Sequence, residues 1–159
     1  MSKKQFTHIS KDGNPQMVDV SQKKITIRVA EAQATIDVGE EILSMIHDDE
    51  LITKKGPVFQ TAIIAGVMGA KKTQELIPFC HPLGLEDCQI KITVVNKLVV
   101  IDTKAVVTSK TGVEMEALTA ASIAALTVYD MCKAISHNIK IREIKLMAKS
   151  GGKKDFKRT

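Results

Sequence analysis

Asp130 and Lys133 are the residues whose types and spacing best suit acid–base chemistry in this chain. They lie three positions apart in ALTVYDMCKA (125–134), and in a helix this spacing places both side chains on one face. Their neighbours are mostly apolar, which favours a cleft over an exposed surface. A lysine beside a carboxylate in such a place can donate or accept a proton. The alternative is an exposed ion pair, which would contribute little to stability.

The segment LIPFCHPLGLEDC (76–88) places Cys80 directly before His81. Cysteine and histidine are common zinc ligands, but a structural zinc site needs four ligands, usually in closely spaced pairs. We expect no metal site, because no such pair exists among the candidates Cys80, His81, Cys88 and Cys132. Adjacent side chains in an extended turn point apart, so His81 alone is the functional candidate. The alternative is a turn histidine held by the backbone.

Two glutamates, Glu114 and Glu116, lie in TGVEMEA (111–117), where a long apolar helix is expected to begin. The helix dipole favours acidic residues in a first turn, and this alone would account for either glutamate. Side chains two positions apart on a helix diverge by about half a turn. We therefore expect one glutamate to face a site and the other to face solvent or a partner chain, and the spacing leaves open which is which.

The chain carries a net charge of +5, and nearly all of its positive charge is lysine, with only three arginines. This composition suits a phosphate-bearing partner. The sequence has no P-loop and no GxGxxG motif, so side chains would have to hold the phosphates. Its five aromatic residues are scattered, which disfavours a nucleic-acid surface. The candidates for a phosphate cradle are Lys54, Lys55, Lys71, Lys72, Lys149, Lys153 and Lys154.

A length of 159 residues with 44% apolar composition fits one domain with a real core. Residues 1–16 are polar and are interpreted as a mobile arm, residues 17–148 as a single domain that would carry any catalysis, and residues 149–159 as a flexible lysine-rich tail. The sequence shows neither a membrane-spanning apolar run nor a secretory leader, so we expect a cytoplasmic protein with free thiols. Whether the tail closes over a ligand is open.

Hydrophobic periodicity predicts four strands and two long helices, with one short helix before the first long one. The strands are expected within 23–37, 87–95, 97–108 and 139–148, with a hairpin turn at 96–97, and the helices within 40–50, 58–72 and 114–135. In the first strand, the alternation of Ile25, Ile27 and Val29 with polar residues marks the half-buried face. The order of the long elements is that of the ferredoxin-like split βαβ fold. We therefore predict an α+β domain, an antiparallel sheet with helices on one face.

Gly66 and Gly69 lie inside the helix expected over 58–72 and, with neighbouring alanines, form a face of small residues. A glycine inside a helix costs about 1 kcal/mol relative to alanine. Two of them suggest that another backbone approaches this helix closely, either within the chain or at an interface.

Seven segments together resemble the cyclic pyranopterin monophosphate synthase family, which is the molybdenum cofactor biosynthesis protein C family. The most specific are AKKTQELIPFCHPL (70–83), KTGVEMEALTAAS (110–122) and ALTVYDMCKA (125–134), and the others are THIS (7–10), MVDVSQK (17–23), KKGPVF (54–59) and AKSGG (148–152). They follow one another in order over nearly the whole chain.

The resemblance implies an enzyme that converts a cyclic dihydro-GTP intermediate into cyclic pyranopterin monophosphate and releases pyrophosphate by general acid–base catalysis. It implies no cofactor and leaves open a divalent ion beside the substrate phosphates. It also implies a homohexamer, a trimer of dimers, with active sites at subunit interfaces. The catalytic residues would be Lys55, His81, Asp130 and Lys133. The residues that contact substrate would be Phe79, Cys80, Glu114, Met115, Glu116 and Lys149. In the mechanism that we expect, Lys71, Lys72 and the tail would hold the phosphates.

Two positions depart from the family pattern. Ile63 stands where arginine is expected, and Phe79 stands where leucine is usual. If that arginine contacts phosphate in the family, lysines must replace it here.

The expected mechanism assigns the proton transfers to Asp130 and Lys133, with Lys55 in support and His81 positioning or protonating the substrate. The order of the proton transfers stays open. One alternative is a lysine-rich module that binds a phosphorylated ligand without turning it over, and such a module would have no use for Asp130. Another alternative is a zinc-dependent hydrolase.

Overall fold

A five-stranded antiparallel sheet forms one layer of the molecule in the computed structural model, which describes residues 12–158. In spatial order its strands are β5 (Asp87–Val95), β6 (Leu98–Ser109), β1 (Thr26–Asp37), β7 (Lys140–Ser150) and β8 (Phe156–Lys157). The order of the four long strands is that of the ferredoxin-like fold. The predicted fold class is therefore confirmed.

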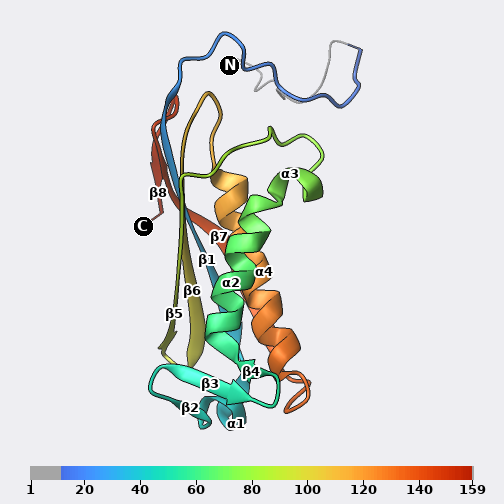
Figure 1. Ribbon diagram of the computed structural model, residues 1–159, viewed down its shortest axis with the longest axis vertical. Coiled ribbons are helices and arrows are strands. Elements are labelled where there is room, and N and C mark those ends of the chain that lie inside the picture. The colour runs from blue at the N-terminus through green and yellow to red at the C-terminus, as the bar shows by residue number, and fades with distance from the viewer. Residues whose placement is uncertain (1–11, 159) are drawn as a thin grey trace, which may run out of the picture.

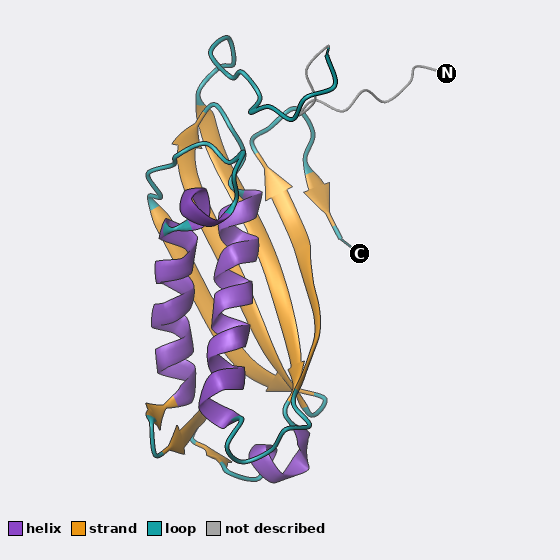
Figure 2. Ribbon diagram, turned by 90° about the vertical axis from the view of Figure 1, so that its right-hand side faces the viewer, coloured by secondary structure: helices purple, strands orange, loops and turns teal. Residues whose placement is uncertain are grey.

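Two long helices, α2 (Val58–Lys71) and α4 (Glu114–Cys132), lie side by side on one face of this sheet (Figures 1 and 2). The small-residue face of α2 packs within the chain. A Cβ added to Gly66 would lie 2.4 Å from Cδ1 of Ile90 and 2.9 Å from the carbonyl oxygen of Ala120 in α4. The close backbone approach inferred from the glycines is thus made between the two helices.

β1 buries the face opposite to the one expected from its large apolar residues. Ile25, just before the strand, and Ile27 are 62% and 63% exposed. The alternate positions Ala30, Ala32, Ala34 and, at the far end of the strand, Ile36 are buried instead. The reason lies in α4, which is itself rich in alanine and packs against β1. Small side chains on both elements allow this close packing, and the large side chains at the start of the strand lie outside it.

The chain between β1 and α2 forms short elements that periodicity did not resolve. They are α1 (Gly39–Leu43), β2 (Ile46–His47), β3 (Glu50–Thr53) and β4 (Gly56–Pro57). The helix expected over 40–50 is therefore only five residues long. Asp48 and Asp49, with φ of 51° and 57°, reverse the chain between β2 and β3. The three strands form a second small sheet at the end of the molecule where α2 begins (Figure 1).

One predicted turn and one unexpected helix complete the comparison with the sequence. The predicted hairpin between β5 and β6 is confirmed, because Asn96 and Lys97 have φ of 49° and 64° and join the two strands. The short helix α3 (Thr73–Leu76), which follows α2, was not expected.

The C-terminal tail does not begin where the sequence analysis expected it. Lys149 and Ser150 belong to β7, and β8 folds back antiparallel to that strand. The tail expected from residue 149 therefore begins inside the sheet. Of the expected N-terminal arm, residues 1–11 lie outside the described residues, and residues 12–16 are exposed. No helix in the described part of the chain is long and apolar enough to cross a membrane.

Candidate active site

The turn that carries His81 meets the first turn of α4 at one end of the molecule. A cavity of about 480 Å³ lies between them. Its lining includes six residues that the sequence analysis assigned to the site, namely Phe79, Cys80, His81, Glu114, Met115 and Glu116. Val18, Val20 and Lys23, which precede β1, line the same cavity. The chain therefore brings together three segments that are far apart in the sequence.

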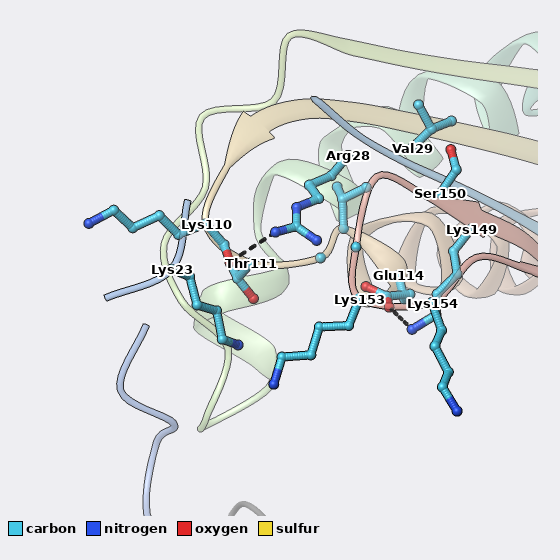
Figure 3. A pocket seen from close by; sticks show the side chains of 13 residues that line it. Lys23, Arg28, Val29, Lys110, Thr111, Glu114, Lys149, Ser150, Lys153 and Lys154 are labelled. Carbon is cyan, nitrogen blue, oxygen red and sulfur yellow. Dashed lines mark hydrogen bonds and ion pairs between the residues drawn. The ribbon is translucent and has the colours of Figure 1, made fainter. Parts of the chain in front are cut away.

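A second, smaller cavity of about 190 Å³ adjoins the first and is strongly basic (Figure 3). The two cavities share several lining residues, among them Lys23, Glu114 and Lys153. The cationic side chains that line the second cavity are Lys23, Arg28, Lys110, Lys149, Lys153 and Lys154. They come from the segment before β1, from β1, from the loop before α4, and from β7 and the loop after it. Such a set of cations around one cavity suits phosphate groups.

The backbone holds two of these cations in place. Arg28 donates from Nε to the carbonyl oxygen of Ser109 at 3.4 Å and from Nη2 to that of Lys110 at 3.3 Å. Lys110 donates to the carbonyl oxygen of Ser21 at 2.7 Å and so ties the N-terminal segment to the loop before α4. The guanidinium of Arg28 therefore keeps a fixed place beside the cavity.

Both glutamates at the start of α4 line the first cavity, although the spacing favoured only one. Burial by itself would raise the pKa of Glu114, but the hydrogen bond from Lys149, a backbone hydrogen bond and the charges of Lys149 and Arg28 together outweigh burial, and the pKa lies below its usual value. Glu116 is only 4% exposed, and its burial raises the pKa of its carboxyl. The two carboxyls thus differ in proton affinity within one cavity, and Glu116 keeps its proton to higher pH than Glu114 does.

Cys80 lines the same cavity as a free thiol. Burial, together with the charge of Glu116, raises the pKa of this thiol. A thiolate is the reactive form of cysteine, so this environment suppresses reactivity. The structure therefore favours a scaffolding role for Cys80 beside His81.

Lys55, Asp130 and Lys133 form a cluster at the other end of α4. Nζ of Lys55 lies 2.8 Å from Oδ2 of Asp130, and Nζ of Lys133 lies 2.7 Å from Oδ1. The hydrogen bonds from Lys133 and Lys55 lower the pKa of Asp130 to about 2, and Asp130 in turn raises the pKa of Lys133. All three side chains are about half exposed. The cluster therefore lies on the surface of the single chain and not in the expected cleft.

The four residues expected to be catalytic do not meet within one chain. His81 lies at the N-terminal end of α4, whereas Asp130 and Lys133 lie at its C-terminal end. α4 has 19 residues and is therefore about 28 Å long. Figure 1 shows the same separation, with the loop after α3 at one end of the helix pair and the β3–β4 hairpin at the other.

Of the remaining residues expected at the site, one lines a cavity and two do not. Lys149 lines the basic cavity, but Lys71 and Lys72, exposed at the end of α2, line neither cavity. Ile63 is partly buried on α2 and is also absent from both linings. The departure from the family pattern at Ile63 therefore does not alter the two cavities directly.

Sequence reasoning missed Lys23, Arg28 and Lys110 as site residues. Arg28 offered one signal, since it is one of only three arginines in a lysine-rich chain. Lys23 and Lys110 offered none, because a lysine in a polar segment is usually a solvated surface residue. The segment before β1, β1 itself and the loop before α4 converge in the folded chain. Only this convergence shows that the three cations line one cavity.

The described residues contain no cluster of three or more histidine, cysteine, aspartate or glutamate side chains arranged to hold a metal ion. The three cysteines are separate free thiols.

The fold and its two polar groups define a ferredoxin-like α+β protein with a lysine-lined cavity at one end and a lysine–aspartate cluster at the other. The chain belongs to the MoaC family, whose model matches residues 17–152. The resemblance drawn from the seven segments is thereby confirmed.

Two curated relatives carry the same printed name, molybdenum cofactor biosynthesis protein 1. The chain is 50% identical over 156 residues to the relative from Drosophila melanogaster, which covers 97% of this chain and 27% of that protein. It is 47% identical over 167 residues to the relative from Dictyostelium discoideum, covering 94% of this chain and 26% of that protein. The chain thus spans about a quarter of the length of these curated relatives.

Proposed function

We propose that this chain acts in molybdenum cofactor biosynthesis as a cyclic pyranopterin monophosphate synthase. The enzyme would convert a cyclic dihydro-GTP intermediate into cyclic pyranopterin monophosphate and release pyrophosphate. The observation that carries the proposal is the pair of adjoining cavities, one basic and one lined by His81 and two glutamates. Membership of the MoaC family and the names of the relatives support it.

The basic cavity would hold the triphosphate. Arg28, Lys23 and Lys153 are placed to neutralise phosphate oxygens. In the phosphate step, a substrate hydroxyl attacks the innermost phosphorus, the new P–O bond closes the cyclic phosphate, and the bond to pyrophosphate breaks. Cations around the leaving pyrophosphate stabilise the charge that it gains. The structure supports this use of the cavity better than the use of Lys71 and Lys72.

The adjoining cavity would hold the purine-derived part of the substrate, where the pyran ring is built. His81 would position or protonate this part of the substrate. Glu116 would carry a proton more readily than Glu114, because its burial raises its pKa. Phe79 and Met115 would contribute apolar contact area.

A second copy of the chain would complete the site. The Lys55–Asp130–Lys133 cluster lies about 28 Å along α4 from the cavity of its own chain, so the cluster of one subunit would meet the cavity of another. This arrangement agrees with the homohexamer, a trimer of dimers, that the family resemblance implies. In the single chain the cluster is half exposed, and burial at an interface would lower the pKa of a lysine toward the range useful for proton transfer.

The test is to add the purified protein, after metal analysis, to the cyclic dihydro-GTP intermediate and to follow product and pyrophosphate together. Equal amounts of both, without bound zinc, support the proposal. Binding without turnover would instead favour a module that only sequesters a phosphorylated ligand, and turnover dependent on bound zinc would favour the hydrolase alternative.

Asp130→Asn gives a sharper version of the same test. This variant should lose turnover at least about a hundredfold while keeping the parent's oligomeric state, because the two lysines lose the charge that aligns them. Asp102→Asn, a change of an exposed aspartate on β6, is the matched control. Turnover near the parent value in Asp130→Asn would remove Asp130 from the mechanism.

A further inference from the structure

The first turn of α2 has no capping side chain at the usual position. Pro57 occupies the N-cap, and no side-chain hydrogen bond comes from it. A helix leaves its first backbone N–H groups without partners, and a capping side chain ordinarily accepts the N–H of the second or third helical residue. In α2 these residues are Phe59 and Gln60.

Glu50 supplies the missing cap from another element. Its Oε1 accepts the N–H of Phe59 at 2.8 Å, and its Oε2 accepts the N–H of Gln60 at 3.1 Å. Oε1 also accepts the N–H of Leu51, its own neighbour, at 2.8 Å. A negative charge at a helix N-terminus is favoured by the helix dipole. The first residue of β3 therefore caps α2, although ten positions separate Glu50 from Gln60.

This contact closes the β3–β4 hairpin at its base. The hairpin pairs Ile52 with Pro57 and Thr53 with Gly56, and its turn carries Lys55. Oγ1 of Thr53 accepts the N–H of Lys55 at 3.2 Å, and Gly56 has a φ of 108° that L side chains rarely adopt. The turn is thus held from within by Thr53 and Gly56, while Glu50 attaches its base to the helix.

The position of this turn decides whether Lys55 reaches α4. Nζ of Lys55 contacts both Oδ2 of Asp130, at 2.8 Å, and the carbonyl oxygen of Asp130, at 3.1 Å. α2 and α4 are held together by close packing along their length. A contact that fixes the hairpin on the first turn of α2 therefore also fixes the position of the hairpin relative to Asp130 on α4.

We propose that Glu50 is a positioning residue for Lys55: by capping α2 from β3 it fixes the β3–β4 turn so that the ammonium group of Lys55 stays on Asp130. The consequence for turnover rests on the proposed function, in which Lys55 belongs to the catalytic group. The contact between Lys55 and Asp130 does not depend on that function and can be measured without substrate.

The test uses the full chain with Glu50→Gln, which keeps the shape of the side chain but removes its charge and one of its two acceptor oxygens. Side-chain NMR follows the titration of the Asp130 carboxyl, whose pKa in the parent is about 2 because both lysines contact it. The midpoint should rise in Glu50→Gln, in the same direction as in Lys55→Met. Glu75→Gln, a change of an exposed glutamate on α3, is the matched control and should leave the midpoint unchanged.

Turnover supplies the second readout. In Glu50→Gln, kcat should fall by about tenfold to a hundredfold with little change in KM, since a small displacement of a catalytic group slows the reaction without weakening substrate binding. A folded Glu50→Gln protein with the parent's Asp130 midpoint would overturn the inference. A raised midpoint with unchanged kcat would support the positioning of Lys55 and would instead contradict the catalytic role proposed for Lys55.

A second variant separates positioning from simple capping. Glu50→Gln combined with Pro57→Asp places an ordinary capping side chain at the N-cap of α2 and so protects the fold if Glu50→Gln alone is unstable. Thermal stability should recover, while the Asp130 midpoint should stay raised, because the hairpin base is still detached. A return of the midpoint to the parent value would show that Glu50 only caps the helix, and Pro57→Asp alone controls for the loss of proline.

Discussion

Nζ of Lys149 lies 2.8 Å from Oε1 of Glu114, and this ion pair joins the end of β7 to the first turn of α4. Glu114 lines both cavities, and Lys149 lines the basic one. Both side chains are partly exposed, at 38% for Lys149 and 28% for Glu114. The pair therefore links β7 to α4 at the point where the two cavities meet.

Lys149→Met should destabilise the protein at neutral pH and much less in acid. The pKa of Glu114 lies below 4.5, so its charge stabilises the fold above the unfolded-state pKa, and this contribution is lost as the pH falls through the folded-state pKa. For a partly exposed pair we expect about 0.5 to 1 kcal/mol at pH 7. Urea unfolding of parent and variant at about pH 7 and about pH 3 measures the difference. Lys145→Met, which removes a surface pair with Glu143, is the control, and a difference independent of pH would contradict the assignment.

Gly151→Ala should weaken both the fold and phosphate binding. Gly151 has a φ of 83°, and a Cβ at this position would lie 1.8 Å from the carbonyl oxygen of Ile27. The loop that carries Lys153 must therefore shift, at a cost of at least about 1 kcal/mol. Thermal unfolding and the affinity for the triphosphate substrate measure the two effects. Gly84→Ala, where an added Cβ meets nothing within 4 Å, should change neither, and a Gly151→Ala protein with normal affinity would exclude this loop from the site.

Cys80→Ser should keep most of its turnover, whereas His81→Ala should lose it. Burial raises the pKa of the Cys80 thiol, which keeps it protonated and unreactive at neutral pH. Initial rates with the cyclic dihydro-GTP intermediate, together with the oligomeric state of each variant, check this. Loss of activity in Cys80→Ser with retention in His81→Ala would reverse the roles given to the two residues.

Arg28→Met should raise KM for the triphosphate substrate by about tenfold or more and should lower the salt dependence of binding, because a fixed guanidinium loses its phosphate contact. Lys71→Met should have little effect, since Lys71 lines neither cavity. Steady-state kinetics at two salt concentrations measure both variants. A larger rise in KM for Lys71→Met than for Arg28→Met would instead place the phosphate contacts at the end of α2, as the sequence alone suggested.

Local signals in the sequence were enough for the main elements. Alternation predicted β5 and β6, and Asn96 with Lys97 marked the turn between them, because a two-residue hairpin needs residues that tolerate positive φ. The three-residue spacing of Asp130 and Lys133 predicted their contact, because helix geometry brings such side chains together. These features depend on residues close in the chain, so the sequence determined them by itself.

The tertiary structure decided which faces and which distant residues meet. It buried the alanines of β1 in place of Ile27, because α4 needs small partners for close packing. It brought Lys55 to Asp130 and Arg28 to the basic cavity, and it separated His81 from both lysine partners of Asp130 by the length of α4. Such relationships depend on packing between elements far apart in the chain, and no local pattern of residue types records where those elements cross.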